Sequence, residues 1–265
     1  MRALVRTEAG VALVERAVPR VGVVVEVAYA GVCRTDLAVA DGTIVVSDGR
    51  VLGHELAGWV EGAPVTVIPF SGRSWLGIDR DGAFADRVAV PAACVLPLPA
   101  GMSLVHGAYV EPVAAALGAL VAIRPRDRVL VTGAGRIAAL TVRVIEAAGA
   151  MATRDVAAGP FDVIVEHDGA APVAALNDGG TLVLKSRARR DVVLDAAELV
   201  ARDLVVRGAS HGSFATAIEW LSTRRIAIDD LLAAPRPLDA YADVFAAARG
   251  ETAKQLFAIG ASCAA

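Results

Sequence analysis

The sequence predicts an α/β protein with two domains, because its first hundred residues and the remainder differ in pattern. The first part contains short β-branched runs interrupted by Gly and Pro, at residues 21–33, 54–62 and 84–99. From about residue 105, Ala-rich helical segments alternate with compact apolar strands, and this alternation predicts βαβ units in a parallel sheet. The length of 265 residues suits one large or two modest domains.

The elements of the second part follow from apolar runs that end in turn residues. Residues 127–135 are predicted as a buried strand and residues 136–150 as a helix. Three more strands and a helix are then expected, in the order 160–169, 179–186, 203–210 and 214–226. The last segments, a helix over 238–250 and a strand over 254–260, have no partner that the pattern alone assigns.

The composition excludes several classes of function. Apolar residues make up 55% of the chain and charged residues 21%, which allows a sizeable core, and a net charge of −3 gives no basic excess for nucleic acid. The longest apolar run, residues 113–123, is shorter than the roughly 20 residues that a spanning helix needs. No secretory signal is visible, and three cysteines (Cys33, Cys94 and Cys263) suit a reducing interior. We therefore expect a cytoplasmic protein.

A glycine-rich turn stands between the strand at 127–135 and the next helix. Its sequence from 133 to 138, Gly-Ala-Gly-Arg-Ile-Ala, has the form G-x-G-x-x-A. Glycines there permit a tight turn and let backbone N–H groups approach a pyrophosphate, although small residues also simply allow close packing. The candidate dinucleotide contacts of this turn are Gly133, Gly135, Arg136 and Ile137.

Two charged residues follow the turn at the distance where a ribose-binding acid is expected. Asp155 would bind the ribose hydroxyls of NAD, whereas the adjacent Arg154 would favour the 2′-phosphate of NADP. The sequence leaves both cofactors open, and we favour NAD.

Potential metal donors lie in the β-rich part and just after it. Cys33, His54, Glu55 and Glu111 offer a thiolate, an imidazole and two carboxylates. Three such ligands with one open position are what a catalytic zinc requires. Taken singly, a cysteine in an apolar strand is more often buried filler, so the spacing alone does not decide.

The motifs occur in an order that resembles one family. G-V-C-R-T-D (31–36), G-H-E (53–55), E-P-V (111–113) and the turn at 133–138 precede F-D-V-I-V-E at 161–166. This series is similar to that of the medium-chain dehydrogenase/reductase superfamily, in particular its zinc-dependent alcohol, sorbitol and threonine dehydrogenase branch. The resemblance implies a GroES-like β-barrel catalytic domain, from 1–105 and 237–265, around a Rossmann-type dinucleotide-binding domain at 106–236.

The resemblance also implies roles for individual residues. Cys33 and His54 match catalytic zinc ligands, and Glu55 or Glu111 matches the carboxylate ligand. Thr35 matches a hydroxyl that passes the substrate proton toward the cofactor ribose, and Asp36 matches a carboxylate that orients the zinc-bound histidine.

Three departures from the family pattern modify these expectations. Residues 68–82 lack the cysteines of the usual structural-zinc lobe, so we expect one catalytic zinc and no structural zinc. Only residues 156–160 separate Asp155 from the next strand, so the Rossmann domain should be shortened by about one βα unit. Ala38 stands where many members have a relay histidine.

The sequence therefore predicts a zinc-dependent oxidoreductase that transfers hydride between NAD(P) and an alcohol or carbonyl substrate, and that forms a possible homo-oligomer. Two alternatives remain open: a zinc-containing lyase or cyclase on the same fold, and a dinucleotide-binding protein without catalysis. No nucleic-acid or membrane partner is expected.

Overall fold

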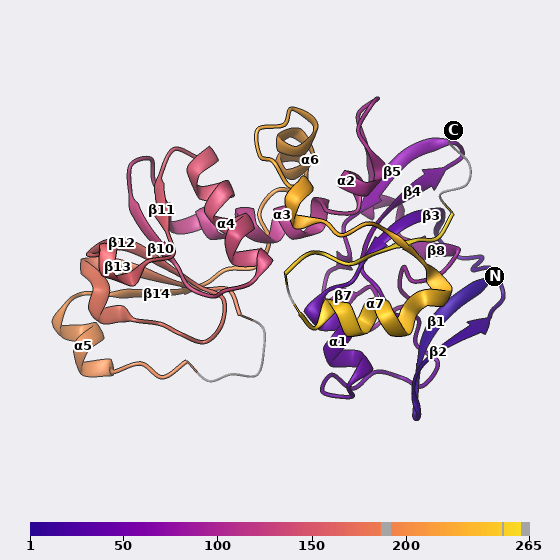
Figure 1. Cartoon of the computed structure of the whole chain (residues 1–265), viewed down its shortest axis with the longest axis horizontal. Helices are drawn as coiled ribbons and strands as arrows, with labels where there is room; N and C mark the ends of the chain where they lie inside the picture. The colour runs from indigo at the N-terminus through magenta and orange to yellow at the C-terminus, as the bar shows by residue number, and fades with distance from the viewer. Residues whose placement is uncertain (187–191, 251, 261–265) are drawn as a thin grey trace. The chain divides into compact units, whose positions relative to one another are not determined.

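The computed structural model describes residues 1–186, 192–250 and 252–260, and it divides the chain into two compact units (Figure 1). The first unit contains Met1–Glu111 and Asp229–Ala265, and the second contains Pro112–Ile228. The joins expected from the sequence, at 105/106 and 236/237, assign less of the chain to the first unit. Cys263 lies outside the described residues.

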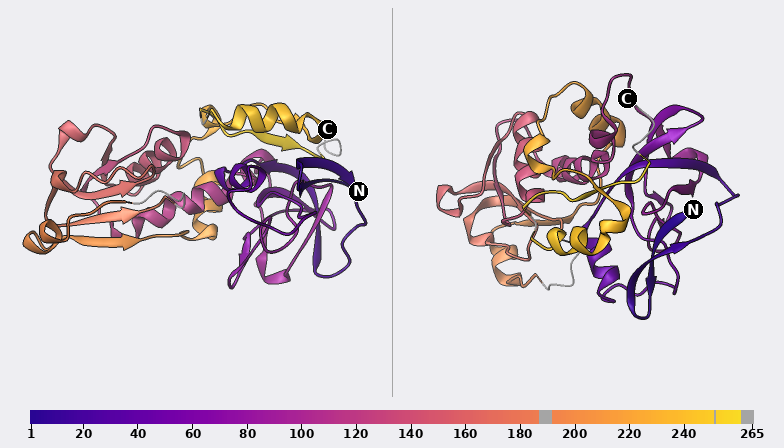
Figure 2. Two further views of the ribbon diagram at one scale, coloured as in Figure 1. Left: turned by 90° about the horizontal axis from the view of Figure 1, so that it is seen from below. Right: turned by 45° about the vertical axis from the view of Figure 1, so that its right-hand side comes forward.

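The first unit is built on a seven-stranded sheet in the order β15-β16-β3-β4-β5-β9, with β8 also paired to β3. Its strands are β3 (Val23–Gly31), β4 (Glu55–Val60), β5 (Ala63–Val67), β8 (Arg87–Val90), β9 (Val95–Pro97), β15 (Arg236–Pro237) and β16 (Leu256–Ala258). The C-terminal segment, yellow in Figure 2, returns to this unit. Its strand β16 pairs antiparallel with β3. This pairing supplies the partner that the sequence pattern did not assign to the tail.

Smaller elements complete the first unit. They are the hairpin β1 (Arg2–Thr7) and β2 (Gly10–Glu15), the hairpin β6 (Phe70–Ser71) and β7 (Ser74–Trp75), and the helices α1 (Arg34–Ala40), α2 (Leu104–Gly107) and α7 (Tyr241–Ala248). An apolar core joins the sheet to α1 and α7, with Phe84, Phe245 and Phe257 in mutual ring contact.

Turn chemistry explains where two of the predicted runs end. The run at 54–62 stops at Val60 because Glu61 and Gly62 both have positive φ, 49° and 81°, as a two-residue hairpin turn into β5 requires. The run at 84–99 is not one strand: Pro91 lacks an N–H for the ladder, and a 3₁₀ turn at Ala92–Cys94 separates β8 from β9.

The second unit is a parallel five-stranded sheet in the order β11-β10-β12-β13-β14. Its strands are β10 (Arg128–Val131), β11 (Met151–Thr153), β12 (Phe161–Glu166), β13 (Leu176–Leu184) and β14 (Val205–Gly208), and its helices include α4 (Arg136–Ala147), α5 (Ala196–Ala201) and α6 (Phe214–Ser222). The helix α3 (Val110–Leu117) contains the join between the units. Separate apolar clusters cover the two faces of the sheet.

The strand order confirms the predicted fold class with its shortened Rossmann half. A full doubly wound domain has the order 3-2-1-4-5-6, and the second unit matches this order without its third strand. Between β11 and β12 the chain forms only the 3₁₀ turn η3 (Val156–Ala158). No helix among the described residues is long and apolar enough to cross a membrane.

Candidate functional site

Cys33 is held at the beginning of α1, directly after β3. It has extended backbone angles and is the residue from which the helix starts. The Asp36 side chain reaches back to accept a hydrogen bond from the Cys33 N–H at 2.8 Å, which fixes this first turn. The thiol is only half-buried and donates to Thr35 Oγ1 at 3.8 Å.

Asp36 connects the two segments that carry the donors. One of its oxygens accepts from Cys33, and the other accepts from the Gly53 N–H at 3.1 Å and lies 3.3 Å from His54 Nδ1. Because Nδ1 faces Asp36, the Nε2 atom of His54 is the one left for a metal. The carboxylate is buried, so these three contacts replace its hydration.

Gly53 is required for the chain to enter β4. Its φ is +95°, and a Cβ at this position would lie 2.5 Å from the Phe84 ring. The turn places His54 just before β4 and Glu55 as its first residue, both buried. The G-H-E motif therefore combines one backbone requirement with two donors.

Cys33, His54 and Glu55 form the only group of three potential metal donors found among the described residues. One ligand atom from each lies within 4.8 Å of the other two. Sulfur, imidazole nitrogen and carboxylate oxygen at such separations fit a zinc ion bound at about 2.0–2.3 Å from each, after small side-chain shifts. The donor set therefore suits zinc.

Burial and the surrounding charges shift the pKa values of His54 and Glu55. Burial would lower the pKa of His54, but Asp36 and Cys33 outweigh burial and raise it well above the usual value. Burial also raises the pKa of Glu55, Lys254 opposes that shift, and the nearby charge of Glu111 adds to it. Glu111 is buried in the first turn of α3 and lies outside the three-donor group.

The glycine-rich turn leads from β10 into α4 and leaves the start of that helix without a side-chain cap. Gly133 has φ of +98°, and a Cβ there would lie 3.3 Å from the Cβ of His167. Gly135 precedes α4, and no side chain caps that helix. Arg136 and Ile137 are its first residues, so N–H groups of the first turn point out of the helix at the carboxyl end of β10.

Arg154 and Asp155 follow β11, the strand next to β10, and both are exposed. Parallel neighbours end at the same edge of a sheet, so this pair and the glycine turn share one edge. Asp155 Oδ1 accepts from the Ala157 N–H at 2.9 Å and caps the η3 turn. Its other oxygen would remain available to a ribose.

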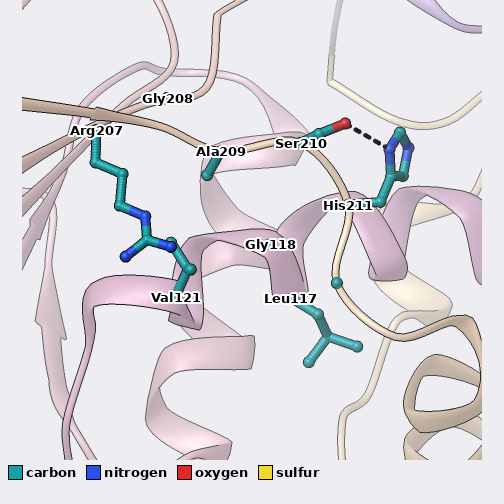
Figure 3. Close-up of a pocket in the computed structure, with 9 residues that line it drawn as sticks. Leu117, Gly118, Val121, Arg207, Gly208, Ala209, Ser210 and His211 are labelled. Carbon is teal, nitrogen blue, oxygen red and sulfur yellow. Dashed lines mark hydrogen bonds between the residues drawn. The ribbon is translucent and has the colours of Figure 1, made fainter. Parts of the chain in front are cut away.

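A separate pocket of about 370 Å³ lies in the second unit, between the start of η2 (Gly118–Ala122) and the chain after β14 (Figure 3). Arg207 and Val121 lie at one end, and the Ser210 hydroxyl lies 3.1 Å from His211 Nδ1 at the other. None of the metal donors lines this pocket.

Sequence reasoning missed one residue of the donor site, Lys254. This buried lysine, close to the C-terminus, forms an ion pair with Glu55 Oε2. A signal was present, because the chain contains only two lysines and many arginines. The pairing itself depends on the return of the tail to the first sheet, which no local pattern shows.

Comparison with known proteins relates both units to dehydrogenases. Residues 20–100 match the family model described as the alcohol dehydrogenase GroES-like domain. The L-galactonate-5-dehydrogenase of Escherichia coli K12 is 32% identical over 157 residues, which span 48% of this chain and 46% of that protein. The sorbitol dehydrogenase of Halalkalibacterium halodurans is 30% identical over 186 residues, 56% of this chain and 54% of that one. The chain thus aligns with about half the length of each of these two relatives.

Solved structures share the fold over nearly the whole chain. A cobalt- and zinc-bound thermostable alcohol dehydrogenase from Pyrobaculum aerophilum superposes with a TM-score of 0.86 at 25% identity, covering 97% of this chain and 99% of that one. An Escherichia coli alcohol dehydrogenase in complex with NADH gives a TM-score of 0.87 at 19% identity, covering 97% and 99%.

Proposed function

We propose that the chain is a member of the medium-chain dehydrogenase/reductase superfamily and that it interconverts an alcohol and a carbonyl compound, using zinc and NAD(P). One observation carries the proposal: Cys33, His54 and Glu55 gather within 4.8 Å in a chain that also has a dinucleotide turn. The names of the relatives favour a small polyhydroxylated substrate.

We propose one zinc per chain, held by Cys33, His54 and Glu55, with Glu111 as the alternative carboxylate ligand. A zinc ion bound there supplies a Lewis acid that lowers the pKa of a substrate hydroxyl. Residues 68–82 contain the short β6–β7 hairpin, in which the rings of Phe70 and Trp75 lie 4.9 Å apart, and we assign no structural zinc to this segment. Cys33 and Cys94 are both free thiols, and a thiol ligand suits a cytoplasmic location.

The protein's own residues would position the substrate and accept its proton. Thr35, whose hydroxyl lies beside the Cys33 thiol, would take the hydroxyl proton of the alcohol and pass it to water. Asp36 would act as a positioning residue, because it fixes both Cys33 and the His54 ring. Ala38 in α1 offers no group for a further relay, so water would carry the proton beyond Thr35.

The proposed reaction is tested by turnover of the zinc-loaded protein. With NAD and a panel of secondary alcohols and polyols, we expect at least one substrate to reduce the nicotinamide. After zinc is removed with a chelator and magnesium is added in its place, we expect no reduction. Nicotinamide absorbance measures both. Zinc binding with nucleotide binding but no turnover on any alcohol, aldehyde or ketone would contradict the oxidoreductase proposal and favour a non-redox zinc enzyme.

We also propose that two copies of the chain associate through β14. This strand ends the sheet order, its outer edge has no strand partner among the described residues, and Val205 and Val206 are 49% and 38% exposed. An exposed apolar edge favours pairing with another strand, and two identical edges related by a two-fold axis are self-complementary. We expect a dimer by light scattering and a monomer for Val206→Asp with its thermal midpoint retained. A wild-type monomer at high micromolar concentration would refute this interface.

A further inference from the structure

Lys254 is placed against the candidate metal site by the C-terminal segment. Its backbone is fixed on both sides, since its N–H donates to Leu231 O at 2.7 Å and its carbonyl accepts from Ala233 N–H at 2.9 Å. The side chain is 3% exposed and its ammonium pairs with Glu55 Oε2, while Glu55 is 1% exposed. This is a fully buried ion pair rather than a surface contact.

The sheet leaves room for this pair at one position of β3. Gly31 lies opposite Glu55 in β4 and opposite Leu256 in β16. A Cβ on Gly31 would lie 2.7 Å from Lys254 Cε and would also overlap Glu55 Oε2. The lysine side chain therefore occupies space that any other residue at position 31 would fill.

The buried carboxyl groups around Lys254 require a positive counter-charge. Asp36, Glu55 and Glu111 are all buried carboxyl groups, and the charge of Glu111 acts on Glu55. The Cys33 thiol lies within 4.8 Å of a Glu55 carboxylate oxygen. A buried carboxylate without a counter-charge is strongly unfavourable, and zinc would normally provide that charge for its ligands. Lys254 provides a cation that does not depend on metal supply.

We propose that Lys254 is a resident counter-ion for Glu55 that keeps the donor group folded before metal arrives and then shares the carboxylate with zinc. The ammonium occupies Oε2, and a carboxylate has a second oxygen for the metal. Lys254 is thus a positioning residue. Only the sharing of the Glu55 carboxylate with zinc rests on the proposed zinc site, because the ion pair itself forms without metal.

The test compares thermal unfolding of the metal-free and zinc-loaded protein for the wild type and three variants. Lys254→Met leaves Glu55 buried and unpaired, so we expect its metal-free midpoint to fall by roughly 6–20 °C. With saturating zinc, the difference in midpoint between the wild type and Lys254→Met should shrink to about half or less, because zinc supplies the missing cation. Lys254→Met combined with Glu55→Gln removes both charges, and its metal-free midpoint should return to within about 3 °C of the wild type.

The control is Lys185→Met, the same substitution at the other lysine of the chain. Lys185 Nζ donates to the carbonyls of Ala209 and Ser210 in the second unit, so zinc should not rescue any loss that it causes. Equal loss in Lys254→Met with and without zinc, or a double variant as unstable as the single one, would overturn the counter-ion role. If Lys254→Met does not fold without metal, the double variant decides: folding supports the proposal and failure overturns it. A wild type that takes up no zinc would refute the metal site, while the metal-free comparison would still test the pair.

Discussion

Cys33→Ala is expected to abolish stoichiometric zinc binding and, with it, turnover. In the proposed site Cys33 would supply a thiolate, which bonds zinc more strongly than an added water would, and alanine at the beginning of α1 offers no replacement ligand. Elemental analysis of the purified variant should find less than about one tenth of the zinc that the wild type holds. We expect about one zinc per wild-type chain.

The matched control is Cys94→Ala in the same unit. Cys94 is buried, and its thiol donates to the Phe70 carbonyl at 3.6 Å, so its loss should cost roughly 1 kcal/mol of stability and no zinc. Two zincs per chain, zinc retained by Cys33→Ala, or zinc lost from Cys94→Ala would each refute the assignment of the site.

The donor group could be predicted from the sequence because local geometry constrains each segment that carries a donor. Gly53 is needed for its positive φ beside Phe84, and Asp36 is needed three residues after Cys33 to reach back to its N–H. Such requirements act within a few residues, so they appear as short motifs. The glycine turn is legible for the same reason.

Features that depend on contacts between distant segments could not be predicted from local motifs. The Lys254–Glu55 pair needs β16 to lie beside β3, and periodicity in the tail does not state which sheet it joins. The sequence likewise does not resolve the N-terminal hairpin β1–β2 within the β-rich region, because neither strand alternates: three consecutive residues of β1 are buried, and β2 is partly buried throughout most of its length. In both cases the missing information is a pairing rather than an element.

The sequence predicts the missing strand of the second unit. The effect of this loss on the affinity for the cofactor follows from the contacts that the missing strand would have made. The chain goes from β11 to β12 through η3 alone, so less protein is available to cover an adenosine. Losing a few apolar contacts costs on the order of 1–3 kcal/mol, which is roughly ten- to a hundred-fold in dissociation constant. We therefore expect NADH to bind, and to bind weakly for this fold.

Asp155→Ala is expected to weaken NADH binding by roughly ten- to a hundred-fold and to narrow the gap to NADPH. The free oxygen of the exposed carboxylate would accept a hydrogen bond from a ribose hydroxyl, and one such bond to a charged acceptor contributes about 1.5–3 kcal/mol. The same charge would repel a 2′-phosphate, so its removal should help NADPH while it harms NADH. Arg154→Ala should leave NADH affinity nearly unchanged. Fluorescence titration of both nucleotides against the three proteins measures each effect.

Asp155 also caps the η3 turn, so a stability effect must be separated from a binding effect. Asp195 provides the control, because its Oδ1 accepts from the Ala197 N–H at 2.8 Å in the same i to i+2 arrangement at the start of α5. Asp195→Ala should cost a similar amount, about 1 kcal/mol, and leave both nucleotides unaffected. If wild type binds NADPH more tightly and Arg154→Ala removes that binding, Arg154 determines the cofactor and the preference is for NADP. If neither nucleotide binds at millimolar concentration, the glycine turn serves packing alone and the dehydrogenase proposal fails.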